Sequence, residues 1–139
     1  MSAKGAQAGA EPKPAIMVIE PEVLIRMTIA EFLRECGFNV IEGVVAEDVR
    51  TVLDSGVHLD IVFSEVRLPG NTDGFALARQ LRNVHPEIDV ILTSGIAGAA
   101  EKSTDLCAEG PLKKPYEPTE VAARIHRLLE RRRSAVKRS

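Results

Sequence analysis

The stretch DIVFSEVRLPGNTDG, residues 60–74, is the most informative part of this chain for its fold. Its residues 61–64 are a short apolar run that predicts a buried strand, and this strand ends at Glu65. Residues 67–74 are dense in turn formers, so we expect a loop there. Asp73 is a suitable N-cap for a following helix, whose apolar residues should face a sheet: Leu77, Leu81 and Val84. The stretch therefore predicts one strand–loop–helix unit.

The same alternation of apolar runs and amphipathic segments continues on both sides of this unit. Further strands are expected at residues 15–19, 38–41, 90–93 and 110–113. The helices between them should bury three further sets of residues: Ile25, Ile29, Phe32 and Cys36; Val49, Val52 and Leu53; and Val121, Ile125 and Leu128. Five βα units in about 120 residues predict an α/β fold, a flavodoxin-like doubly wound sheet of five parallel strands in the order 2-1-3-4-5, with helices on both faces.

Several local signals mark where these elements begin and end. Gly37 is expected to end the first helix as its C′ residue, and Pro118 to begin the last one. Residues 94–106 are rich in Gly and Ala and have only a weak pattern, so a helix there would be marginal. The end of the first helix and the start of the last helix are therefore well marked by the sequence, whereas no clear helix boundary is marked between residues 94 and 106.

The ends of the chain differ in composition from its body. Residues 1–14 predict a disordered leader, residues 15–131 the folded domain and residues 132–139 a basic C-terminal tail. No apolar run reaches the roughly 18 residues of a membrane span, and no signal-peptide core is present, so a cytoplasmic location is the default expectation.

Charge is distributed unevenly along the chain. Residues 131–139 carry five basic groups and no acid, whereas residues 1–130 hold 13 basic and 20 acidic groups, a net charge of −7. The acidic body argues against nucleic-acid binding by the domain itself. The basic residues either meet an acidic partner or are a solvated helix end, which we favour because cations suit a helix C-terminus.

Cysteine and histidine have no functional spacing in this sequence. Cys36 and Cys107 are far apart and fit no metal or redox motif, so we expect two buried, small apolar residues. His58, His85 and His126 also lack metal-ligand spacing and are expected at the surface. These residues therefore indicate neither a metal centre nor a redox site.

Polar residues stand where the predicted strands end. Glu20 follows the first strand, Glu65 the third, Ser94 the fourth and Lys114 the fifth. Ligand sites of open α/β sheets lie outside the carboxyl ends of the strands. We therefore expect these four side chains to meet in one crevice, with Lys114 in contact with Glu65 directly or through one water.

Three segments make residues 16 to about 131 resemble the response-regulator receiver domain of two-component signalling. Residues 60–70, closing with Asp73-Gly74, are similar to the third strand and following loop of that family. Residues 91–95, ILTSG, resemble its fourth strand, and residues 112–116, LKKPY, its fifth strand and Lys-Pro turn, a turn that is commonly cis in the family. The resemblance rests on the order and spacing of the three segments together.

The resemblance implies a phosphorylation site of known construction. In active receivers an acidic pair after the first strand and an acceptor Asp after the third hold Mg²⁺, and the acceptor attacks a phosphoryl donor. A Lys of the Lys-Pro turn pairs with the acceptor or its phosphate, and a Thr or Ser after the fourth strand bonds to the phosphoryl group. An aromatic residue of the fifth strand often follows that hydroxyl inward.

Carried over residue by residue, the resemblance is incomplete. Glu20 falls on the first position of the acidic pair, but Pro21 falls on the second and has no ligand atom. Glu65 falls on the acceptor position and Pro111 on the aromatic one. Ser94 and Lys114-Pro115 do match. We therefore expect a degenerate, pseudo-receiver site with no catalytic residue and no cofactor beyond weak Mg²⁺ binding by Glu20 and Glu65.

The change from Asp to Glu at the acceptor position has three interpretations. The longer Glu65 side chain places its charge partway toward a phosphoryl group, so it can mimic the phosphorylated state incompletely. In the second interpretation Glu65 is one acid of a decayed site, and in the third some phosphorylation remains at Glu65 or at a neighbouring acid.

The predicted function is that of a signalling module and not of an enzyme. The domain should act by protein–protein interaction with a histidine kinase or an output protein. The resemblance places the interaction face, and a possible homodimer contact, on residues 97–130. Two alternatives stay open: a working phosphoacceptor response regulator, and nucleic-acid binding through the basic tail, which predicts a steep salt dependence.

Overall fold

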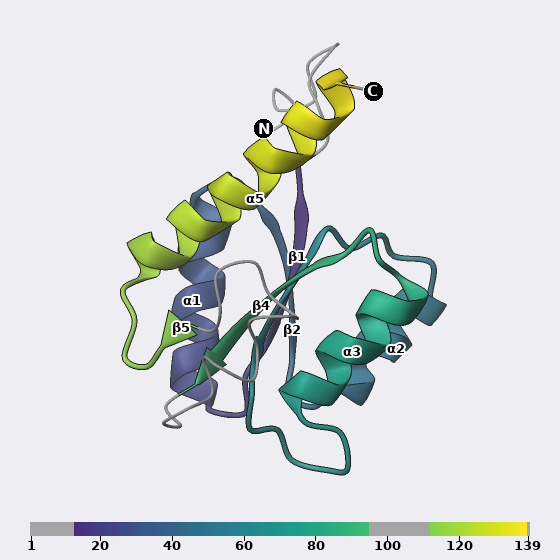
Figure 1. Cartoon of the computed structure of the whole chain (residues 1–139). Coiled ribbons are helices and arrows are strands. Elements are labelled where there is room, and N and C mark those ends of the chain that lie inside the picture. Colours follow the sequence, from purple (N-terminus) through teal and green to yellow (C-terminus); the bar gives the residue numbers. More distant parts are fainter. Residues whose placement is uncertain (1–12, 95–111, 139) are drawn as a thin grey trace.

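The computed structural model describes residues 13–94 and 112–138, with the backbone alone for residues 135–138. Strands and helices alternate along the chain (Figure 1). Their bounds are β1 Ala15–Ile19, α1 Val23–Glu35, β2 Asn39–Gly43, α2 Glu47–Asp54, β3 Ile61–Glu65, α3 Gly74–Val84, β4 Asp89–Ser94, β5 Leu112–Lys113 and α5 Pro118–Arg138. No helix in these two segments is both long enough and apolar enough to cross a membrane.

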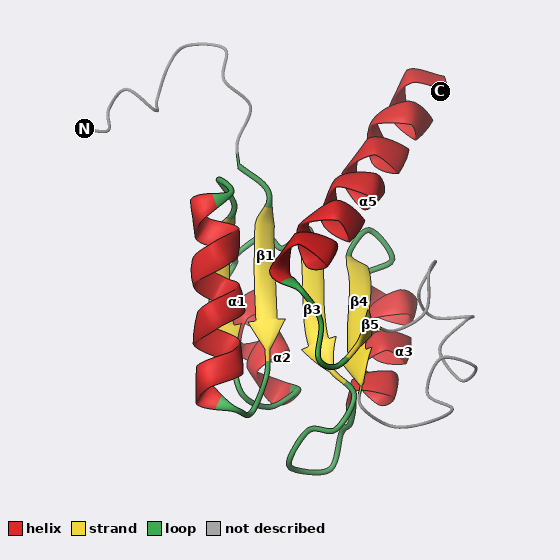
Figure 2. Ribbon diagram, turned by 90° about the vertical axis from the view of Figure 1, so that its left-hand side faces the viewer, coloured by secondary structure: helices red, strands yellow, loops and turns green. Residues whose placement is uncertain are grey.

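The five strands form one parallel sheet in the order β2-β1-β3-β4-β5. This order and the flavodoxin-like α/β architecture confirm the prediction. Helices α1 and α5 cover one face of the sheet, and α2 and α3 cover the other (Figures 1 and 2). The carboxyl ends of all five strands therefore lie along the same edge of the sheet.

Alternate residues of the central strands pack into two layers, as the pleat of a strand requires. On the α1 and α5 face, Ile16, Val18, Ile61 and Phe63 pack against residues of those helices, which include Ile29, Leu33, Val121, Ile125 and Leu128. On the other face, Met17, Ile19 and Val62 pack against Val49, Leu77 and Leu81. Because both faces are covered, the strands are apolar runs without alternation, which is the pattern that predicted them.

Local chemistry sets the helix ends near the carboxyl edge. The Asp73 carboxylate accepts a hydrogen bond of 2.8 Å from the backbone N–H of Ala76, which confirms Asp73 as the N-cap of α3. Gly74 follows, and a Cβ at this position would lie 2.5 Å from the carbonyl oxygen of Glu65. Only glycine lets α3 begin this close to the end of β3. At the far end of α1, Gly37 has a φ of 99°, as expected of a C′ glycine.

Three expectations about individual residues and bounds were wrong. Val84 is 68% exposed, because it lies on the rim of a groove between α2 and α3 instead of under the sheet. Cys36 is exposed, since α1 ends at Glu35 and the buried Phe38 covers its last turn. Strand β2 begins at Asn39 and continues to Gly43, two residues beyond the expected end.

Other expectations fall partly on residues that the structure does not describe. Cys107, Pro111 and residues 95–106 lie outside the described residues, as does most of the expected leader. Helix α5 begins at Pro118, as predicted, and continues as a helix through residues 132–138, the segment expected to be a basic tail. His58 and His126 are exposed, and His85 is half-buried.

Candidate functional site

The carboxyl edge of the sheet brings together the four predicted site residues. Glu20 follows β1 directly, Glu65 and Ser94 are the last residues of β3 and β4, and Lys114 follows β5. Glu20, Glu65 and Ser94 are all buried. The backbone N–H of Lys114 donates to the carbonyl of Ser94 at 3.1 Å, which continues the pairing of β5 with β4. The peptide bond between Lys114 and Pro115 is cis.

Lys114 lies between the two glutamates. Its Nζ is 2.7 Å from Oε1 of Glu20 and 2.6 Å from Oε1 of Glu65. The two glutamate side chains are only 3% and 8% exposed, and that of Lys114 is 22% exposed. The predicted contact of Lys114 with Glu65 is therefore confirmed, and the ammonium bridges a second carboxylate as well. We call these three residues the carboxylate–lysine cluster.

The cluster keeps Lys114 in its charged form. Burial acts to lower the pKa of Lys114, but the hydrogen bonds and charges of Glu20 and Glu65 outweigh that effect and raise the pKa above its usual value. A buried carboxylate pair without a counter-ion would be costly. The ammonium supplies that counter-ion, so the cluster carries a net charge of about −1.

All four carboxylate oxygens of the cluster have partners. Besides Lys114, Oε1 of Glu65 accepts from the Thr93 hydroxyl at 3.2 Å, and Oε2 accepts from the backbone N–H of Arg67 at 3.1 Å. Oε2 of Glu20 accepts from the backbone N–H of Glu22 at 3.0 Å. Both glutamates are thus held in one geometry by hydrogen bonds and ion pairs.

Thr93 was missed by sequence reasoning because it stands inside an apolar strand. The available signal was its position directly before Ser94 at the end of β4. Parallel pairing aligns Thr93 with Glu65, and this alignment brings its hydroxyl to the carboxylate. Asp73, in contrast, caps α3 and is not part of the cluster.

The carboxylates at this edge leave few oxygen ligands free for a Mg²⁺ ion. Hard cations need several oxygen ligands. Within residues 13–94 and 112–138, no three His, Cys, Asp or Glu residues are grouped as they would be around a metal ion. Pro21 follows Glu20 without a ligand atom, and both glutamates of the cluster are already paired with Lys114.

Tyr116 borders the cluster two residues after Lys114. Its ring meets that of Phe63 edge to face with a centroid distance of 5.8 Å, so Tyr116 is a packing residue of the core. Its hydroxyl oxygen is buried and has no hydrogen-bond partner among the described residues. Burial raises the pKa of Tyr116, and the charges of Glu20 and Glu65 raise it further.

Several solved structures that resemble this chain in fold are receiver domains. The chain aligns with the receiver domain of an HD domain-containing protein from Pseudomonas fluorescens with a TM-score of 0.78 and 21% identity, covering 88% of this chain and 99% of the other. A CheY-like receiver from Methanospirillum hungatei aligns with a TM-score of 0.80 and 17% identity, covering 89% and 99%. These likenesses concern the fold alone.

The sequence comparison defines the family. The model of the response regulator receiver domain matches residues 16–126. This chain therefore belongs to the response regulator receiver family, whose members are signalling modules of two-component systems.

Curated relatives contain the same domain within longer proteins. The transcriptional regulatory protein AruR of Pseudomonas aeruginosa is 32% identical over 128 residues, which are 88% of this chain and 52% of that protein. The sensor kinase CckA of Brucella abortus is 32% identical over 120 residues, 84% of this chain and 12% of that protein. The chain thus spans about half the length of the regulator and a small part of the kinase.

Proposed function

We propose that this chain is a receiver-like signalling module that acts through protein–protein contacts and is not switched by ordinary aspartyl phosphorylation. The observation that carries this proposal is the carboxylate–lysine cluster, in which the ammonium of Lys114 lies 2.6–2.7 Å from both Glu65 and Glu20. The cluster stands at the carboxyl edge of the sheet, where the family resemblance places the phosphorylation site.

Glu65 takes the position of the acceptor Asp in this proposal. Its carboxylate accepts hydrogen bonds from Thr93 and from the backbone of Arg67 and pairs with Lys114. Charge-assisted contacts of this kind are the ones that a phosphoryl group makes to a lysine and a hydroxyl. We infer that Glu65 mimics the phosphorylated state incompletely, since its charge of −1 is smaller than that of a phosphate.

The metal requirement of phosphorylation supports the same interpretation. Pro21 removes one acidic ligand, and Lys114 already neutralises the two glutamates that remain. We expect Mg²⁺ to bind with a dissociation constant on the order of millimolar or weaker, because few oxygen ligands are free. No catalytic residue is proposed, and the domain is not proposed to be an enzyme.

Partners are inferred from the relatives and from the fold. A sensor kinase and a transcriptional regulator both contain a related segment, so we propose a histidine kinase or an output protein as partner. The proposed interaction face is residues 97–130, of which β5 and the first half of α5 are described. A homodimer through this face and a cytoplasmic location complete the proposal.

A labelling experiment tests the proposal. The chain is incubated with acetyl phosphate and Mg²⁺, and its intact mass is measured against a receiver domain that retains the acceptor Asp. We expect no added phosphoryl group on this chain and a labelled control. Labelling of the wild-type chain would favour the alternative, a working phosphoacceptor, and would overturn the proposal.

A Mg²⁺ titration followed by NMR is the companion measurement. Signals of Glu20, Glu65 and Lys114 should shift only at millimolar concentrations, as expected of a site with few oxygen ligands. Saturation at micromolar Mg²⁺ would contradict the degenerate site.

A further inference from the structure

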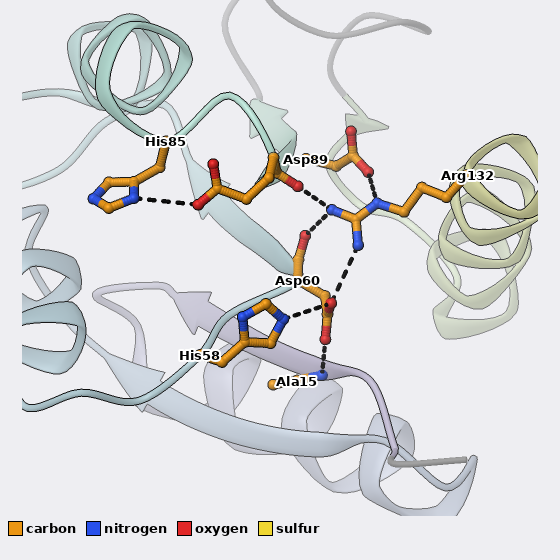
Figure 3. Close-up of polar contacts among 7 residues, drawn as sticks. Ala15, His58, Asp60, His85, Asp89 and Arg132 are labelled. Carbon is orange, nitrogen blue, oxygen red and sulfur yellow. Dashed lines mark hydrogen bonds and ion pairs between the residues drawn. The ribbon is translucent and has the colours of Figure 1, made fainter. Parts of the chain in front are cut away.

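A second charged cluster lies at the opposite, amino-terminal edge of the sheet. Arg132 of α5 extends its guanidinium to Asp60, which precedes β3, and to Asp89, the first residue of β4 (Figure 3). Its Nε is 2.8 Å from Oδ2 of Asp89 and its Nη1 is 3.2 Å from Oδ1 of Asp60. Its Nη2 donates to the backbone carbonyls of Asp60, at 2.9 Å, and of Glu87.

The acceptors of this cluster are themselves fixed to the sheet. The other carboxylate oxygen of Asp60 accepts from the backbone N–H of Ala15, at 2.8 Å, where β1 begins. Nε2 of His58 lies 3.0 Å from the oxygen that Arg132 contacts. The backbone N–H of Asp89 donates to the carbonyl of Asp60 at 3.1 Å. One side chain thus joins α5 to the beginnings of three adjacent strands.

Arg132 follows the buried apolar residues of α5 that the structure describes. Among the side chains of α5 described up to Ser134, the buried apolar ones are Val121, Ile125 and Leu128, and Arg132 follows Leu128 by one turn on the same side. Beyond this point the C-terminal turns extend past the sheet (Figures 1 and 2). The neighbouring Arg133 lies 3.7 Å from the carboxylate of Glu130, and both of these side chains are largely exposed.

We propose that Arg132 is a latch that fixes the outer turns of α5 to the amino-terminal edge of the sheet, and that opening this latch releases the helix beyond Leu129 while the domain stays folded. Among the described side chains of α5 the buried apolar ones precede Arg132, so its polar contacts fix the helix to the sheet edge at the point where the outer turns begin. Such contacts open at a smaller free energy than the core, which makes a local opening possible.

The geometry requires arginine at this position. The planar guanidinium uses three nitrogens to reach four oxygens on three residues, and a lysine ammonium cannot reproduce this fork. The latch itself does not depend on the proposed function. One consequence does rest on it: because α5 carries part of the proposed interaction face, the latch would set how that face is presented to a partner.

Amide hydrogen exchange tests the latch in the full chain. Arg132→Ala and Arg132→Lys are compared with wild type and with Arg133→Ala, which removes the same charge one residue away. In Arg132→Ala, amides of residues 130–136 should exchange about tenfold faster, as expected when hydrogen bonds to charged groups are lost. Amides of β1, β3 and residues 121–128 should stay far better protected than those of residues 130–136, because they exchange only when the core opens. Arg132→Lys should fall between Arg132→Ala and wild type.

Asp89→Asn removes the charge of the carboxylate that pairs with Arg132. It should also increase the exchange rates of the amides of residues 130–136. Two outcomes would overturn the proposal. In one, the amides of residues 130–136 exchange at the same rates in Arg132→Ala as in Arg133→Ala, which would mean that the contacts of Arg132 do not stabilise the outer turns. In the other, amides of residues 130–136 exchange as slowly as those of residues 121–128 in wild type and in Arg132→Ala, which would mean that the outer turns open only when the whole domain unfolds.

Discussion

Nζ of Lys114 lies 2.6 Å from Oε1 of Glu65, and this ion pair joins the end of β3 to the turn after β5. The same ammonium contacts Glu20 after β1, so one lysine links three strand ends at the carboxyl edge. Both acids are buried, which makes the lysine their necessary counter-ion.

Removing the counter-ion should destabilise the fold. Lys114→Met leaves two buried carboxylates close together, and we expect the free energy of unfolding to fall by about 3 kcal/mol at pH 7. Urea unfolding measures this change, with Lys113→Met as the control, because Lys113 is an exposed neighbour. Equal stability of the two variants would contradict this account of the cluster.

Restoring the acidic ligands should restore phosphorylation only in combination. Glu65→Asp alone should remain unlabelled by acetyl phosphate, because Pro21 still provides no metal ligand. Pro21→Asp together with Glu65→Asp should label slowly and only with Mg²⁺. The two changes act on one site, so their effects should be strongly non-additive.

The control for this series is Pro21→Asp with Glu65→Gln, which provides the ligand without a nucleophile. Labelling of Glu65→Asp alone would mean that Pro21 matters less than we propose.

The amino-terminal edge should be the acid-sensitive part of the domain. Burial acts to raise the pKa of Asp60, but the hydrogen bond from Ala15 and the contacts with His58 and Arg132 outweigh it and lower the pKa below its usual value. A carboxylate with a depressed pKa adds stability above its unfolded pKa, and that stability is lost as the pH falls through the folded value. The stability difference between wild type and Asp60→Asn should therefore be constant near neutral pH and shrink below about pH 4. A difference that persists at pH 2 would contradict the assignment.

The single tyrosine offers a test of burial next to the cluster. The Tyr116 hydroxyl has no partner among the described residues, so Tyr116→Phe should raise the free energy of unfolding by about 1 kcal/mol. Tyr116→Ala loses the contact with Phe63 and should lower it by about 3 kcal/mol. Urea unfolding followed by circular dichroism compares the two. A loss of stability in Tyr116→Phe would indicate that the hydroxyl is hydrogen-bonded in solution.

Local features of the sequence were sufficient for the architecture and for the location of the site. Apolar runs, helical periodicity and the cap at Asp73 are local properties, and with the crossover rule for parallel strands they are enough for the strand order. Strand ends meet at one edge of such a sheet, so the pairing of Lys114 with Glu65 was predictable as well.

Long-range packing, in contrast, determines which side chains complete each cluster. Three sets of contacts join residues that are far apart in the chain. They are the ion pair of Lys114 with Glu20, the hydrogen bond from the Thr93 hydroxyl to Glu65, and the ion pairs of Arg132 with Asp60 and Asp89. The exposure of Val84 and Cys36 likewise depends on where neighbouring elements end. The periodicity of the sequence predicts which side of a helix is apolar. The residues that this side contacts depend on the strand register and on the length of each packed element.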